Sequence, residues 1–121
     1  MTGITTTTGT TTGTAAATDL YDRFTEGRAL FHGGRFLQAA LALADVVEQS
    51  PEDLSARLLL ARALFHSAQL RGAEEQSREI VHRAPSDAYA HLLLARTLQR
   101  QSRHDEAVPH ARIAAALGVE D

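Results

Sequence analysis

Length, composition and charge restrict what this chain can be. It has 121 residues, and aromatic residues make up only 5% of a chain whose apolar content is mostly Ala and Leu, so we expect an all-α fold. The formal net charge is only -3 and there is no cysteine. These values exclude a strong overall attraction to nucleic acid or anionic lipid, a disulfide framework and a thiolate metal site.

Arginine supplies all of the 12 positive residues in the Lys and Arg count. A GC-rich genome produces such a bias through its codons, so we infer a bacterial source. A single Arg in this chain is therefore weaker evidence of bidentate carboxylate binding than usual.

The chain begins with a low-complexity segment, residues 1–18, that is rich in Thr and Gly. Its composition disfavours helix and offers too little apolar surface for a core, so a disordered tail is expected. It has no basic segment followed by an apolar one, as a secretory signal would. No segment approaches the roughly 20 apolar residues of a membrane span, and we expect a cytoplasmic protein without membrane contact.

The remaining residues, 19–121, repeat themselves at an interval of 34 positions. The sequence LLLAR occurs at 58–62 and again at 92–96, and ALFH occurs at 29–32 and at 63–66. Such a period is typical of stacked units that cannot bury their apolar faces alone. We predict one domain of three units, at about 20–53, 54–87 and 88–121.

Each unit is predicted to contain two helices. In the second unit, Ala56, Leu60 and Leu64 form one stripe of helical period; after a turn at residues 69–72, Ala73, Ser77 and Ile80 form another. Pro51 and Pro85 mark the unit boundaries, and the acidic or Ser residues after them can cap the next helix. Three units then give six helices.

This pattern resembles the tetratricopeptide repeat, a 34-residue helix-turn-helix unit with a later alanine and a terminal proline. The alanines Ala39, Ala73 and Ala107 are in register. Polar residues replace the family's early large residue at Arg23, Arg57 and His91. The resemblance implies an interaction module without enzymatic activity, in which the first helix of each unit lines a concave groove for a peptide or a partner helix.

Arginines recur on the predicted groove at Arg28, Arg62 and Arg96. An arginine fork holds a carboxylate through two hydrogen bonds, so we expect the groove to bind an acidic or amphipathic peptide. The alternative is that duplication copied one arginine that merely covers the core. The predicted groove residues are Tyr21, Phe24, Arg28, His32, Leu58, Arg62, His66, Tyr89, Leu92, Arg96 and Arg100.

The last predicted helix carries an apolar stripe where the second unit has charge. Pro109, Ile113 and Leu117 stand 34 positions after Glu75, Glu79 and Arg83. The stripe predicts a covered face: a homodimer, a different protein, or a further helix that this sequence lacks. A self-assembling unit that dimerises through this helix, with the groove incidental or filled by the tail, is therefore the alternative function.

Sites for chemistry are not evident in the sequence. We find no nucleophile motif, phosphate-binding loop or opposed carboxylate pair, so neither an enzyme nor a cofactor is expected. His32 and His66 stand one repeat apart, which corresponds to a helix diameter of roughly 10 Å, and no further ligand completes a metal site. Nucleic-acid binding would need a stronger basic field.

Overall fold

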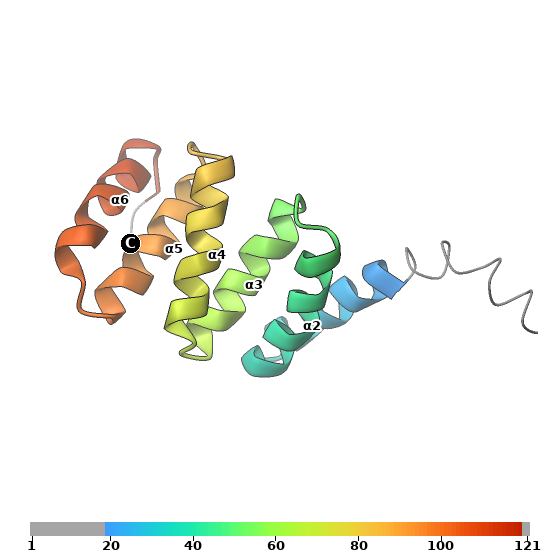
Figure 1. Ribbon diagram of the computed structural model, residues 1–121. Coiled ribbons are helices and arrows are strands. Elements are labelled where there is room, and N and C mark those ends of the chain that lie inside the picture. Colours follow the sequence, from blue (N-terminus) through green and yellow to red (C-terminus); the bar gives the residue numbers. More distant parts are fainter. Residues whose placement is uncertain (1–18, 120–121) are drawn as a thin grey trace, which may run out of the picture.

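The structure, a computed structural model, describes residues 19–119 and contains six helical segments and no strand within that range (Figure 1). This confirms the predicted all-α repeat fold; the expected disordered tail, residues 1–18, lies outside the described residues. Residues 19–32 form the first helix. The later helices are α2 (Phe36–Gln49), α3 (Leu54–His66), α4 (Leu70–Arg83), α5 (Ala88–Arg100) and α6 (His104–Ala116).

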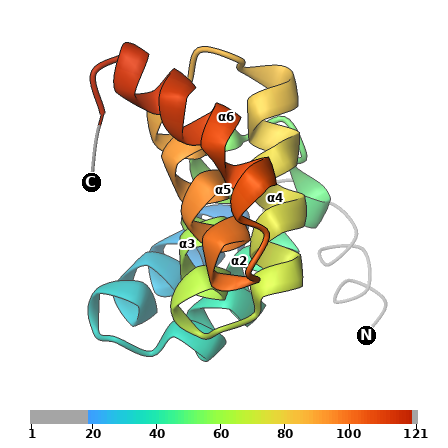
Figure 2. The same cartoon turned by 90° about the vertical axis from the view of Figure 1, so that its left-hand side faces the viewer.

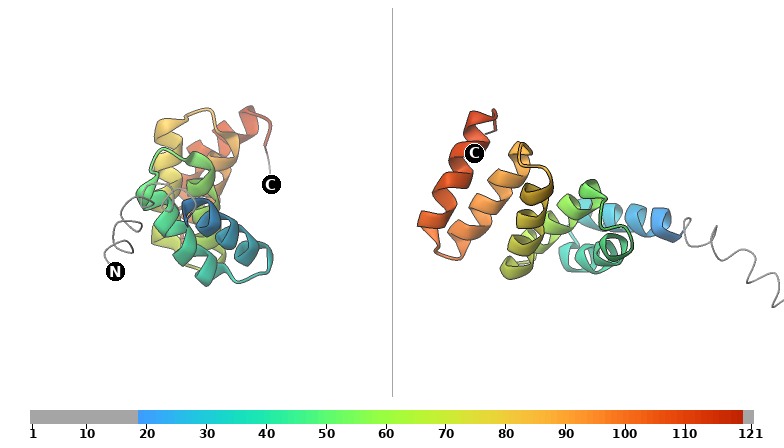
Figure 3. Two further views of the ribbon diagram at one scale, coloured as in Figure 1. Left: turned by 90° about the vertical axis from the view of Figure 1, so that its right-hand side faces the viewer. Right: turned by 45° about the horizontal axis from the view of Figure 1, so that its top comes forward.

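The helices form three antiparallel pairs that follow one another along the molecule. The first helix pairs with α2, α3 with α4, and α5 with α6. Figure 2 looks onto the end that α6 closes, and Figure 3 shows the staggered row of helices together with the opposite end. Each inner helix therefore has neighbours on both sides, whereas the two end helices of the row each have one face that no other described helix covers.

One backbone conformation turns the chain within every unit. Gly34, Ala68 and Ser102, spaced by 34 residues, have φ values of 81°, 63° and 62°. Only Gly adopts this left-handed region without steric cost. The turn before α4 spans residues 67–69 and not the predicted 69–72. Gly72 was misread as a turn residue because glycine usually marks one; it lies inside α4, where its small size admits the side chain of Leu64.

The unit boundaries carry the predicted caps. The side chain of Asp53 accepts a hydrogen bond from the amide of Ala56 at 3.0 Å, and Asp87 accepts one from Ala90 at the same distance. Each aspartate follows a boundary proline by two residues. Capping satisfies amide groups that have no partner within the helix, so these residues fix where α3 and α5 begin.

Small residues bring the helices close together. The three alanines in register, at 39, 73 and 107, are buried, as are Ala61 and Ala95 of the LLLAR segments. Between them pack Leu43, Ile80, Leu94 and Leu98, which solvent does not reach. The buried residues form two clusters, one of the first helix, α2 and α3 and one of α5 and α6 with Val81 of α4 packed against it.

Polar residues fill the position at which the family has a large residue, and they are bonded. Arg57 donates to the carbonyl oxygen of Pro51 and to Oε1 of Gln76, both at 2.8 Å. One repeat later, His91 contacts the carbonyl oxygen of Pro85 at 2.7 Å through Nε2 and His110 at 3.1 Å through Nδ1. These bonds tie the first helix of a unit both to its entry loop and to its second helix.

The histidine pair also restricts protonation. Because a carbonyl oxygen only accepts, Nε2 of His91 carries a proton. The two Nδ1 atoms that face each other then need one hydrogen between them, so only one of the two rings can be cationic. Burial first, and then His91 and Arg78, lower the pKa of His110 below its usual value of 6.5.

Candidate functional site

Arg62 stands at the centre of a surface that crosses all three units. Its guanidinium carbon lies 4.7 Å from the ring centroid of Phe31 on the first helix and 5.6 Å from that of Tyr89 on α5. Both distances suit cation–π attraction. The Nε atom of Arg62 is buried and has no hydrogen-bond partner among the described residues. Arg62 is therefore held in place by rings, and none of the described carboxylates pairs with it.

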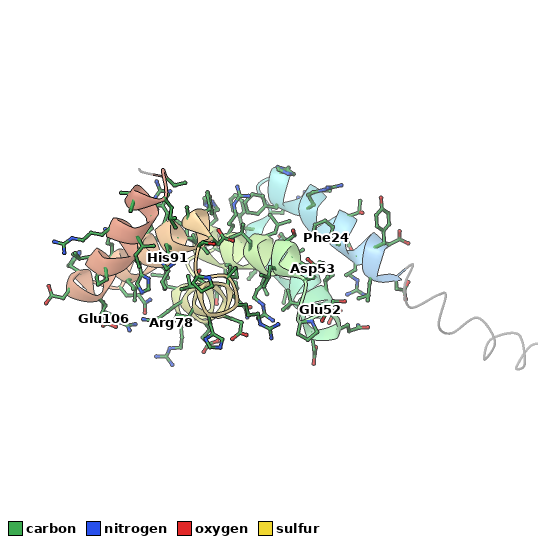
Figure 4. All side chains as sticks on the ribbon, turned by 90° about the horizontal axis from the view of Figure 1, so that it is seen from above. Phe24, Glu52, Asp53, Arg78, His91 and Glu106 are labelled. Carbon is green, nitrogen blue, oxygen red and sulfur yellow. The ribbon has the colours of Figure 1, made fainter. Side chains whose placement is uncertain are left out.

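The same arrangement recurs on both sides of Arg62. Arg28 lies over the ring of Phe24 at 5.6 Å, and Arg100 lies over that of Phe65 at 4.9 Å. Arg100 also donates to the carbonyl oxygen of Phe65 at 3.3 Å. We call the surface formed by Arg28, Arg62 and Arg100 with the rings beneath them the arginine face; Figure 4 labels Phe24 at one end of it.

His66 completes the arginine face on α3. Its ring stacks on Phe36 with centroids 4.7 Å apart and meets Phe31 edge to face at 5.7 Å. Burial, followed by the positive charges of Arg62 and Arg100, lowers the pKa of His66 below 6.5. The ring is consequently neutral at pH 7, and the arginines supply the charge of the face.

Charge is segregated between the helices. The sequences of α3 and α5 contain no acidic residue, and none of the three arginines of the arginine face forms an ion pair with a described residue. The first helix carries Asp19, Asp22 and Glu26. In the second unit the acids lie on α4, where Glu74 bonds Arg78 at 2.9 Å and Arg103 at 2.7 Å. The arginine face thus keeps positive charges that no described carboxylate pairs with.

The structure places the predicted groove residues differently along this surface. Tyr21, Arg28, His32, His66, Tyr89 and Arg100 are exposed, whereas Phe24, Leu58, Arg62 and Arg96 are partly buried. Leu92 is only 8% exposed, so it belongs mainly to the core and offers a ligand little surface.

Sequence reasoning missed three aromatic residues of the arginine face. Phe31 and Phe65 lie beneath Arg62 and Arg100, and Phe36 stacks on His66. The signal for the first two was present, because both belong to the repeated ALFH segment. Phe36 begins the second helix, and only the folded turn brings it to the first-helix side.

The predicted stripe on the last helix is exposed. Ile113 and Leu117 keep 39% and 45% of their surface, and Pro109 of the same stripe is also open to solvent. The equivalent pair in α4, Glu79 and Arg83, forms an ion pair at 2.5 Å. The last helix thus has apolar side chains at the positions where α4 has an ion pair.

Metal sites and membrane spans are absent from residues 19–119. No group of three His, Asp or Glu side chains there is arranged to hold a metal ion. None of the helices in the described range has both the length and the apolar character that a membrane span requires.

Solved structures show where else this fold occurs. A mutant of MamA superposes with a TM-score of 0.78 at 22% identity, covering 83% of this chain and 73% of that one. MamA from Desulfovibrio magneticus RS-1 gives 0.73 at 25% identity, covering 78% and 54%, and MamA MSR-1 gives 0.78 at 23%, covering 85% and 60%. The chain thus spans little more than half of the latter two proteins. These likenesses concern the fold.

Sequence comparison gives the family. No curated protein matches the chain significantly. The family model described as tetratricopeptide repeat matches residues 30–97, which is 68 of the 121 residues and includes all of α2, α3 and α4. Together with the three helix pairs and the 34-residue register, this match shows that the chain belongs to the tetratricopeptide repeat family.

Proposed function

We propose that the protein is an interaction module whose arginine face binds an acidic, extended or helical segment of a partner protein. The repeat fold in general supports a protein-interaction or scaffold role. The observation that carries the finer proposal is that the guanidinium of Arg62 lies over the rings of Phe31 and Tyr89. Rings hold a guanidinium in place and leave its N–H groups to bind a planar carboxylate.

Orientation of the arginines supports the proposal energetically. A free arginine loses rotamer freedom when it binds a ligand, at a cost of roughly 0.5–1.5 kcal/mol per side chain. The rings beneath Arg28, Arg62 and Arg100 already restrict these side chains. The exposed rings of Tyr21 and Tyr89 add apolar surface on which the ligand's own apolar residues can pack.

The test is a binding measurement on defined peptides. Fluorescent peptides of equal length in which Asp and Leu alternate, Asn and Leu alternate, or Arg and Leu alternate are titrated with the full chain at low and high salt. The proposal expects the Asp peptide alone to bind, with an affinity that falls as salt screens the charges. Equal binding of the Asn peptide would reject it.

A second candidate function is self-assembly through the last helix, because Ile113 and Leu117 are exposed. Burying two such side chains is worth about 3–6 kcal/mol before the costs of association. The two functions do not exclude each other, since α6 lies at the end of the row and the arginine face runs along the first helices of the units.

A further inference from the structure

A second surface lies at the opposite end from α6, between the first helix and α2. It is a depression of about 600 Å³ lined by residues of the first helix, of α2 and of the turn between them. This helix pair lies nearest the viewer in the left panel of Figure 3. Leu30 and Leu41 supply its apolar lining, and Glu26 and Arg35 its charges. The paired side chains of Arg23 and Asp45 line it as well.

The repeat shows what occupies the equivalent place in the third unit. Leu30 and Glu26 of the first unit correspond, 68 positions on, to Leu98 and Leu94. Both leucines are fully buried, and Val81 of α4 packs against the cluster that contains them. A helix therefore covers in the third unit the surface that the first unit leaves open among the described residues.

The charged rim of the depression also has an equivalent. Arg35 corresponds to Arg103, whose Nη1 lies 2.7 Å from Oε1 of Glu74 on the covering helix α4. A second, longer pair joins Arg78 of α4 to Glu106 at 3.6 Å (Figure 4). The covering helix α4 thus binds the third unit through a carboxylate as well as through its apolar face.

Arg35 has the equivalent position without that carboxylate. It is exposed and makes no ion pair with any residue in the range 19–119. Arg35 precedes α2 and makes no side-chain cap bond to it, so its charge has no evident task in holding the helix. Its place at the rim matches the place at which Arg103 binds Glu74.

We propose that this depression docks an amphipathic helix of a partner protein, with a carboxylate of that helix paired to Arg35 and its apolar side chains against Leu30. This surface is separate from the arginine face and adds a second kind of ligand. The partner helix lies on the first unit as α4 lies on the third, and a basic residue beside Glu26 completes the charge complementarity.

Charge decides against a second copy of this chain as the occupant. A second copy docked in the manner of α4 would present α6, in which Val108 stands at the position of Glu74. Arg35 would then face an aliphatic side chain at that position, and the acids of α6, Asp105 and Glu106, stand two to three residues before it. Burying an unpaired charge in this way is costly, so an acidic helix fits the depression better than α6 does.

The experiment uses the chain's own covering helix as the probe. A labelled peptide of residues 69–84, which contains α4 and Glu74, is titrated with the full-length protein and followed by fluorescence anisotropy. We expect saturable binding that weakens at least about tenfold in Arg35→Glu, because breaking one hydrogen-bonded charge pair leaves its partner unpaired. A peptide with Glu74→Arg is expected to recover binding to Arg35→Glu.

Two control variants separate this surface from the others. Arg71→Ala, on α4, and Arg112→Glu, on α6, are expected to bind the probe as the wild type does, with unchanged circular dichroism in all variants. A probe that fails to bind at millimolar concentration, or that Arg62→Ala weakens and Arg35→Glu does not, overturns the proposal. The proposal is also overturned if the wild type self-associates without binding the probe and Arg35→Glu abolishes that self-association. A second copy of the chain would then be the occupant.

Discussion

The guanidinium of Arg62 lies 4.7 Å from the ring centroid of Phe31, on the helix of the preceding unit. This contact joins two units across their boundary and sets a positive charge beside His66, whose own ring meets Phe31 edge to face. Arginine, aromatic ring and histidine therefore form one electrostatic unit, and a change in one of them is expected to be measurable at another.

The pKa of His66 is the first such readout. Burial and the charges of Arg62 and Arg100 lower it below 6.5, so replacing Arg100 with Ala is expected to raise it towards that value. Arg112→Ala, on α6, is the control and is expected to leave it unchanged. Titration of the ring protons by NMR measures the difference, and a His66 pKa above 6.5 in the wild type would contradict this account.

The same shift gives a sign for stability. Because the folded chain holds the proton on His66 less tightly than the unfolded chain does, unfolding binds protons at acidic pH. The contribution of neutral His66 to stability is complete above pH 6.5 and is lost as pH falls from there through the folded pKa. The lowered pKa of His110 acts in the same direction. Urea unfolding at successive pH values checks the slope.

Glu74 is the acid with most to lose on replacement. Its side chain is only 12% exposed and bonds Arg78, Arg103 and Gln101. Burial alone would raise its pKa, but these hydrogen bonds lower it overall. We expect Glu74→Ala to reduce the free energy of unfolding by about 1–3 kcal/mol. The exposed pair of Glu79 with Arg83 is the control, and Glu79→Ala is expected to have a much smaller effect.

Close packing leaves no room for a side chain at Gly27. A β-carbon at this position would lie 2.7 Å from Cγ of Leu43, which is fully buried. Gly27→Ala is therefore expected to cost about 1–3 kcal/mol of stability through overpacking. At Gly72 the nearest atom is the end of the Leu64 side chain at 3.3 Å, so helix propensity is expected to make Gly72→Ala near neutral. Thermal unfolding of both variants compares them.

The exposed stripe of α6 predicts self-association. Wild-type protein is expected to sediment as a dimer at micromolar concentration. A double variant, Ile113→Glu with Leu117→Arg, restores the charge pattern of Glu79 and Arg83 and is expected to be a soluble monomer. Analytical ultracentrifugation decides; a wild type that stays monomeric at high concentration would show that the stripe has no partner in a second copy.

The periodicity of the sequence predicted most of the fold. A 34-residue register places Ala39, Ala73 and Ala107 in equivalent surroundings, and equivalent surroundings are buried alike because each unit packs on the next in the same way. The prediction of a turn that includes Gly72 was wrong, because glycine serves both as a turn former and as a small contact residue.

The candidate site could be predicted only in part. The helical spacing placed Arg62 on the first helix of its unit. Which aromatic ring lies beneath Arg62 depends on the angle between neighbouring units. The bonds of Arg57 and His91 to the second helix of their units could likewise not be predicted, because they join residues 19 positions apart. Helical spacing relates residues on one helix, not residues on two.

Calorimetry of an acidic peptide with Arg62→Ala tests the central claim most directly. The peptide is the tightest Asp-rich ligand found with the wild type, and Arg71→Ala is the control, because Arg71 is an exposed arginine of α4 without an ion pair in the described range. A central, ring-packed arginine is expected to contribute at least about 1–2 kcal/mol, so Arg62→Ala weakens binding roughly tenfold while Arg71→Ala leaves it nearly unchanged. Equal affinities of the two variants would place the binding surface away from the arginine face.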